Sequence, residues 1–345
     1  MIQNIKIDEI FILAESYHKK NNFTEAKKLY ESIIKIEPNH LETIFRLGSL
    51  FAQTNNFDKA INFLSKVIAI EPNHSKALNN LGIVFNLLRQ YQKAEYYLKK
   101  AIEINPKHEE AYNNLGSVYF ELGKFENAIK CYHEAIEINS NHNDAIKNIS
   151  ILFRQFGIDV FSDTDVKRLR KLFLLLYKRN DIEHKDIFIN AKKILLARKN
   201  YNELKQIISF HKLLEKPTIN NLINDELFHL MLQKSLIADN LFETILTKIR
   251  REILSLLIKS NLKALEKKFE FIVSLAEQCF LNEYCFFQSN EETNWKNQLN
   301  ISIENNTEVN ELKLAILGCY TPLIKSKHIL NKLLKHKSKN NLFNN

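Results

Sequence analysis

The chain contains few of the residues that β-rich and disulfide-stabilised folds require. Its 345 residues include six glycines, five prolines and four cysteines. Because tight turns between strands depend on glycine and proline, their scarcity favours an all-α protein. The cysteines form no C-x-x-C pair and are too sparse for a disulfide framework, which favours a reducing, cytoplasmic location.

Long apolar runs are also absent. No stretch reaches the roughly 20 apolar residues that a membrane-spanning helix needs. Asp8, Glu9 and Glu15 interrupt the first twenty residues, which therefore resemble an amphipathic helix more than a signal peptide. We expect neither a membrane segment nor a membrane partner.

The glycines are spaced too widely for a nucleotide site. None of them forms G-x-G-x-x-G or a phosphate-binding loop, so we expect no cofactor and no catalytic residue in this chain. The phrase AEQCFLNEYCF holds Glu277, Cys279, Glu283 and Cys285, but each like pair is six residues apart and falls on different faces of a helix. We predict a core helix there, with no metal site.

The net charge of +9 is concentrated in the second half of the chain. Residues 1–155 carry 19 Lys and Arg against 18 Asp and Glu, whereas residues 156–345 carry 30 against 22. A polyanion partner would therefore have to bind the second half. Without exposed aromatic residues among its basic ones, nucleic acid is not favoured.

A period of 34 residues organises the first half. Leucine followed by glycine recurs at Gly48, Gly82 and Gly116, and Ala14 takes the equivalent place. Small residues permit two helices to cross closely, and proline after the second helix stops it. The other positions that recur are aromatic (Tyr17, Phe51, Phe85, Tyr119), alanine (Ala26, Ala60, Ala94, Ala128), isoleucine (Ile36, Ile70, Ile104, Ile138) and proline (Pro38, Pro72, Pro106). We expect the aromatic residues and isoleucines to fill the space between helices.

This pattern resembles the tetratricopeptide repeat family over Ile7 to His142. The resemblance implies an all-α superhelix (a right-handed α-solenoid) of paired helices with repeats at about 7–40, 41–74, 75–108 and 109–142. A partial fifth repeat covers 143–157, so the predicted array spans 1–156. The register is lost at IDVFSDTDV, which predicts a domain boundary near 156–162.

One column of the repeats suggests a binding surface. The residue before each repeated leucine or isoleucine is Ile12, Arg46, Asn80, Asn114 or Asn148. The three asparagines resemble the asparagine ladder in the repeat arrays of O-linked N-acetylglucosamine transferases, which implies that Asn80, Asn114 and Asn148 grip a peptide backbone. A carboxamide suits this role because it both donates and accepts hydrogen bonds. The alternative is that they are solvated groove residues of an asparagine-rich chain.

Further candidates for the same groove flank this column. They are Asn79, Asn113, Lys76, Lys147 and Arg154, of which the basic residues favour an acidic ligand. The histidines His40, His74, His108 and His142 also recur every 34 residues. Equivalent points on successive repeats lie too far apart for one zinc ion, so we predict that these histidines have roles at repeat junctions or at helix starts.

The second half also has helical periodicity, over 163–335, before a basic polar tail at 336–345. Its phrases LTKIRREIL, FIVSLAEQCFLNEY and LAILGCYTPL, within 225–334, resemble the helical segment of bacterial proteins that join tetratricopeptide repeats to a class I S-adenosylmethionine-dependent methyltransferase. A basic amphipathic segment, PLIKSKHILNKLLKHKSK, follows, and we expect it to dock on the bundle.

Three functions remain open at this point. The first is a non-enzymatic scaffold that binds a protein or peptide in the groove of the repeats. The second is the substrate-recruiting arm of a methyltransferase whose catalytic domain is absent here. The third, the arm of a glycosyltransferase, is favoured by the repeats alone.

Overall fold

The structure, a computed structural model, describes residues 2–156, 163–196, 200–207, 212–237, 239–259, 265–282, 288–305 and 310–321. Every regular element in these ranges is a helix, which confirms the predicted all-α class. The chain divides into two compact units, Met1–Leu152 and Phe153–Asn345. Each unit is described by itself.

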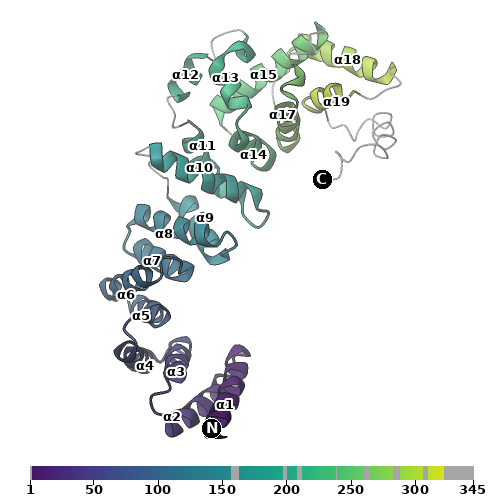
Figure 1. The fold of residues 1–345 in the computed structure, drawn as a ribbon. Helices are drawn as coiled ribbons and strands as arrows, with labels where there is room; N and C mark the ends of the chain where they lie inside the picture. The colour runs from purple at the N-terminus through teal and green to yellow at the C-terminus, as the bar shows by residue number, and fades with distance from the viewer. Residues whose placement is uncertain are drawn as a thin grey trace. The chain divides into compact units, whose positions relative to one another are not determined.

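Unit 1 consists of paired helices that follow the 34-residue period (Figure 1). Within each pair the first and second helices pack along one another, and α2, α4 and α6 each also contact the next first helix. The helices are α1 (Ile2–Lys19), α2 (Phe23–Ile36), α3 (Leu41–Gln53), α4 (Phe57–Ile70), α5 (Ser75–Leu87), α6 (Tyr91–Ile104), α7 (Glu109–Glu121), α8 (Phe125–Ile138) and α9 (Asn143–Gln155), whose residues from Phe153 onward are assigned to unit 2. Each second helix from α2 to α6 ends two residues before its proline, as the sequence predicts.

The repeated glycines lie where the two helices of a pair cross. A Cβ atom on Gly82 would lie 2.4 Å from Leu98 Cγ, and one on Gly116 would lie 2.6 Å from the Tyr132 ring. These distances are shorter than van der Waals contact, so the small residue sets the spacing of the helices.

The turns inside the pairs share one backbone conformation. Asn21, Asn55 and Arg89 each have φ of 57°, and Gly123, at the fourth equivalent position, has φ of 69°. This left-handed conformation reverses the chain direction between the two helices, and glycine and asparagine adopt it most readily.

Three of the repeated histidines cap first helices. The Nδ1 atoms of His40, His74 and His142 accept hydrogen bonds from the backbone N–H groups of Thr43, Ala77 and Ala145, at 3.3, 3.1 and 3.3 Å. His108 precedes α7 in the same way, and its Nδ1 lies 2.8 Å from Ser75 Oγ. The predicted role at helix starts is confirmed.

The prediction that the repeated isoleucines fill the space between helices is wrong for three of them. Ile36, Ile70 and Ile104 are 47%, 51% and 38% exposed. Each is the last residue of a second helix, next to the loop that leads to the following repeat. Neighbouring helices therefore cover only part of its side chain.

Unit 2 is a second helical assembly, built around buried aromatic and aliphatic residues such as Phe173, Phe228, Phe242 and Phe271. Its helices are α10 (Asp163–Lys178), α11 (His184–Leu196), α12 (Asn200–Ile207), the short 3₁₀ helix η1 (Leu213–Glu215), α13 (Pro217–Ile223), α14 (Glu226–Lys234), α15 (Asn240–Ile258), α17 (Phe269–Leu281), α18 (Asn290–Asn305) and α19 (Glu311–Gly318). Asp225 separates α13 from α14, because it caps α14 by accepting a hydrogen bond from Phe228 N.

A buried ion pair lies among α15, α18 and the end of α19. Arg250 and Glu292 are 1% and 2% exposed, and their closest atoms are 3.5 Å apart. Tyr320 donates a hydrogen bond to Glu292 Oε1 at 3.0 Å, and its ring lies 4.5 Å from the Arg250 guanidinium. Glu292 also accepts from Ser289 N, forming a capping box with Ser289 at the start of α18.

Several predictions concern residues outside the described ranges. These are the boundary at 156–162 beyond Phe156, the residues Glu283 and Cys285, the basic segment from Pro322 onward and the tail at 336–345.

Candidate functional site

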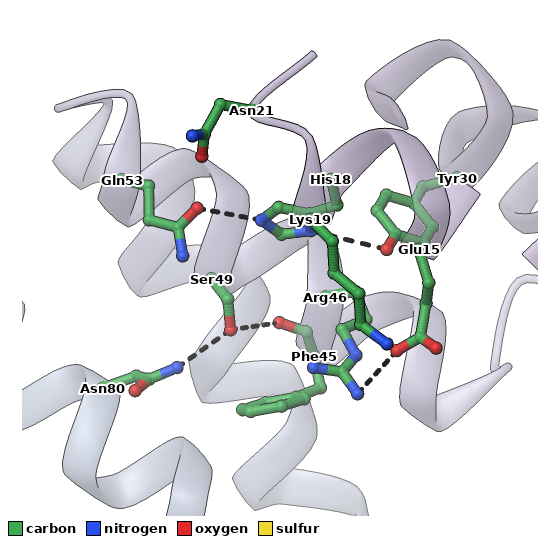
Figure 2. Close-up of a pocket in the computed structure, with 10 residues that line it drawn as sticks. All are labelled: Glu15, His18, Lys19, Asn21, Tyr30, Phe45, Arg46, Ser49, Gln53 and Asn80. Carbon is green, nitrogen blue, oxygen red and sulfur yellow. Dashed lines mark hydrogen bonds and ion pairs between the residues drawn. The ribbon is translucent and has the colours of Figure 1, made fainter. Parts of the chain in front are cut away.

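A polar cleft of about 390 Å³ lies on the first helices of unit 1 (Figure 2). Its lining comes almost entirely from α1, α3 and α5, and the second helix α2 contributes one side chain. The lining residues are Glu15, His18, Lys19, Asn21, Tyr30, Phe45, Arg46, Ser49, Gln53 and Asn80. The positions that line the cleft on α1, α3 and α5 recur on α7 and α9. Because the repeats are equivalent, we expect those positions of α7 and α9 to lie on the same surface of unit 1.

An ion-pair cluster forms one side of the cleft. An Arg46 guanidinium nitrogen lies 2.7 Å from Glu15 Oε1, and Arg46 Nε lies 3.1 Å from Glu42 Oε1. The guanidinium also lies 5.6 Å from the centre of the Phe45 ring. Arg46 therefore links the first and second repeats, although it departs from the asparagine column.

Hydrogen bonds among His18, Gln53 and Tyr30 form the other side. His18 Nε2 lies 2.9 Å from Gln53 Oε1, and because that amide oxygen only accepts, His18 Nε2 carries the proton. His18 Nδ1 lies 3.4 Å from the Tyr30 hydroxyl. Burial raises the pKa of Tyr30 to about 12, which keeps the phenol protonated at neutral pH.

The asparagine column continues from this cleft along the array. Asn80 Nδ2 donates to Ser49 Oγ at 2.8 Å, Asn114 Nδ2 donates to Asn79 Oδ1 at 2.9 Å, and Asn148 Nδ2 donates to Asn113 Oδ1 at 3.1 Å. Each bond joins a first helix to the first helix of the preceding pair. The three amides are half-buried.

The flanking candidates lie in different surroundings. Asn79 and Asn113 are each 6% exposed and support the amides of the next repeat. Lys76 and Lys147 are exposed. Arg154 belongs to unit 2, where its guanidinium lies 3.6 Å from Asp186.

Sequence reasoning did not identify Glu15, Ser49 and Gln53 as site residues. A signal was present, since Glu15 and Ser49 stand two residues after the repeated leucine and fall on the same helix face as the asparagine column. The residue types differ between repeats at that position, so periodicity did not reveal it.

Among the described residues, no group of three or more His, Cys, Asp and Glu side chains is arranged to hold a metal ion. Cys279 and Cys319 are buried in unit 2, and burial raises the pKa of the Cys319 thiol. A buried, protonated thiol is a poor nucleophile. Within the described parts of the chain, no helix combines the length and apolar character needed to span a bilayer.

Two tetratricopeptide repeat family models match the chain, one over residues 75–108 and 109–142 and the other over residues 17–81. Residues 17–142 are therefore tetratricopeptide repeats, and this part of the chain is a helical-repeat scaffold. Both matches end by residue 142, and no comparison supports the methyltransferase resemblance of residues 225–334. No curated protein matches the chain.

Solved repeat proteins are similar in part. A crystal structure of MamA is 23% identical, with a TM-score of 0.38, and the match covers 55% of this chain and 96% of that one. The pilF protein of Pseudomonas aeruginosa is 17% identical, with a TM-score of 0.45, and the match covers 60% of this chain and 92% of that one. YrrB, described as a tetratricopeptide protein with an unusual peptide-binding site, is 20% identical, with a TM-score of 0.36, over 39% of this chain and 70% of that one.

Proposed function

We propose that the tetratricopeptide repeats bind an extended segment of a partner protein along the inner wall, defined as the cleft together with Asn80, Asn114 and Asn148. In this function the chain is a binding scaffold, and it performs no catalysis itself. We place it in the cytoplasm, in keeping with its sparse cysteines, which form no C-x-x-C pair in the sequence.

The observation that carries this proposal is the continuity of the polar surface. The cleft ends at Asn80 on α5, and amides at the equivalent positions of α7 and α9 extend it over two further repeats. A row of amides on successive helices suits a guest that offers a polar group at regular intervals, and an extended backbone does so whatever its side chains.

A peptide-array experiment tests the proposal. The full chain is compared with the triple variant Asn80→Ala, Asn114→Ala and Asn148→Ala on an array of random 15-residue peptides. We expect the parent to retain a set of peptides that the variant loses. Equal retention of the same peptides by both would reject binding through the ladder.

A matched control separates binding from folding. Asn62, Gln92 and Asn127 are exposed on the second helices α4, α6 and α8. Their triple alanine variant removes the same number of amides from another surface and should retain the parent's peptides. Circular dichroism of both variants should show the helical signal of the parent.

The wider role of such a scaffold is a separate question. As the alternative function, the chain would recruit substrates for a methyltransferase supplied by a domain or subunit beyond these residues. A role as the substrate-recruiting arm of a glycosyltransferase is a less favoured alternative. Co-purification with a protein that binds S-adenosylmethionine would support the alternative. Binding of S-adenosylmethionine by the purified chain itself would contradict the non-catalytic role.

A further inference from the structure

The hydrogen bonds of the ladder all run in one direction along the array. In each of the three bonds, the donor is the Nδ2 atom of a ladder asparagine and the acceptor belongs to the preceding first helix. Arg46, at the same position of α3, follows the same rule, because its guanidinium points back to Glu15 on α1. Figure 2 shows the first two of these links, from Asn80 to Ser49 and from Arg46 to Glu15.

This direction fixes how the amides are turned. A carboxamide carries its two N–H donors at one end and its acceptor oxygen at the other. Since the nitrogen of each ladder amide is tied to the preceding helix, the oxygen is turned away from that helix. The Asn80 oxygen accepts a hydrogen bond from Asn79 Nδ2 on the same helix, at 3.4 Å. Among the residues that the structure describes, the oxygens of Asn114 and Asn148 accept none.

A third unused acceptor lies on the same array. Asn86 is on α5, in the column that His18 occupies in the cleft, and its Oδ1 is buried without a hydrogen-bond partner among the described residues. A buried polar atom that lacks a partner is costly. Because this oxygen is closed to solvent, a guest's donor would reach and stabilise it only after the Asn86 side chain rotates outward. Each ladder amide keeps one unused N–H, whereas the oxygens of Asn114 and Asn148 keep both of their lone pairs, so unused acceptor sites outnumber unused donors on these two amides.

We propose that the ladder recognises its guest through the guest's backbone N–H groups, so that the guest is an extended peptide with unsubstituted amides at the gripped positions. This inference rests on the proposed function and adds a polarity to it, namely that the wall accepts hydrogen bonds and the guest backbone donates them. Proline has no backbone N–H, so peptides with proline at those positions are excluded. Asn79 and Asn113 are positioning residues, because their oxygens hold the ladder amides in this orientation.

The test uses three small probes and the parent protein, labelled with ¹⁵N at asparagine. N-methylacetamide offers one N–H and one carbonyl, as a peptide unit does, whereas N,N-dimethylacetamide offers the carbonyl alone. Methylammonium represents a basic side chain. Each is titrated to the same concentration while the side-chain resonances of Asn86, Asn114 and Asn148 are followed by NMR.

We expect N-methylacetamide to shift these resonances and N,N-dimethylacetamide to leave them in place. Equal shifts from the two amides would overturn the proposal, as would no shift from either. A larger shift from methylammonium than from N-methylacetamide would also overturn it, since the wall would then select basic side chains.

The double variant Asn79→Ala and Asn113→Ala tests the positioning role. Without their acceptors the ladder amides can turn over, so the difference between the two amide probes should disappear. If this variant does not fold, the comparison in the parent still decides the polarity.

Equal shifts combined with peptide retention that depends on the ladder would reject the polarity and leave the proposed function intact. A clear preference for N-methylacetamide, combined with peptide retention that does not depend on the ladder, would support the polarity and reject the proposed function.

Discussion

At the scale of single residues, the crossing positions show how the same motif tolerates different packing. In the first repeat Ala14 replaces glycine and Tyr30 is the residue that it faces, and both are fully buried. In the third repeat Gly82 faces Leu98, whose branching carbon Cγ would clash with a Cβ atom. A tyrosine ring edge can move aside by rotation about its side-chain bonds, whereas a leucine branch next to the backbone cannot.

This contrast predicts opposite effects of two equivalent substitutions. Gly82→Ala should lower the free energy of unfolding by about 1 kcal/mol, because overpacking of about 1–3 kcal/mol exceeds the helix-propensity gain of about 1 kcal/mol. Gly116→Ala faces Tyr132 and should be neutral or stabilising, as the first repeat indicates. Urea unfolding followed by circular dichroism measures both. Similar destabilisation in the two variants would refute the distinction.

Adjacent glutamates in unit 2 give a second residue-scale prediction. Glu292→Gln removes the charge from a buried ion pair, which should cost about 3–5 kcal/mol because Arg250 keeps its buried charge. Glu291→Gln removes an exposed partner of Arg251 and should cost less than about 1 kcal/mol. Thermal unfolding of the two variants provides the comparison. A loss for Glu292→Gln as small as that of its neighbour would show that the buried pair contributes little.

At the scale of elements, the helix pairs depend on their turns and caps. Asparagine at two turns and glycine at the fourth suit a positive φ, whereas Arg89 at the third does not. Arg89 is exposed, so its side chain is not needed for packing. The turn between α5 and α6 therefore carries a local strain that the other pairs avoid.

Relieving this strain should stabilise the array. Arg89→Gly should raise the free energy of unfolding by about 0.5–1 kcal/mol, because the left-handed conformation costs a non-glycine residue about 1–2 kcal/mol and glycine loses part of that gain as backbone entropy. The reciprocal change Gly123→Arg, at an equivalent turn with no atom near the new Cβ, should destabilise by a similar amount. The midpoints of urea unfolding of both variants are compared with that of the parent. An unchanged midpoint for Arg89→Gly would mean that the turn is unstrained.

At the scale of the whole molecule, the period predicts the helices of unit 1 well because each recurring residue has a local cause, such as a glycine at a crossing or a proline after a helix. The sequence also indicates the column of Asn80, Asn114 and Asn148. It does not reveal that their nitrogens bind the preceding repeat, because this depends on side-chain rotamers and inter-helix distances. In unit 2 no period is available, so the sequence predicts helical character but not the boundaries between helices, such as the one set by the side-chain cap at Asp225.

The most direct test of the central claim is photo-crosslinking of the peptide that the array retains most strongly. The peptide carries a diazirine group at successive positions, and mass spectrometry maps the crosslinks on the full chain. We predict crosslinks along the inner wall, on the first helices α1, α3, α5, α7 and α9. Crosslinks confined to the second helices α4, α6 and α8, or to unit 2, would contradict the account.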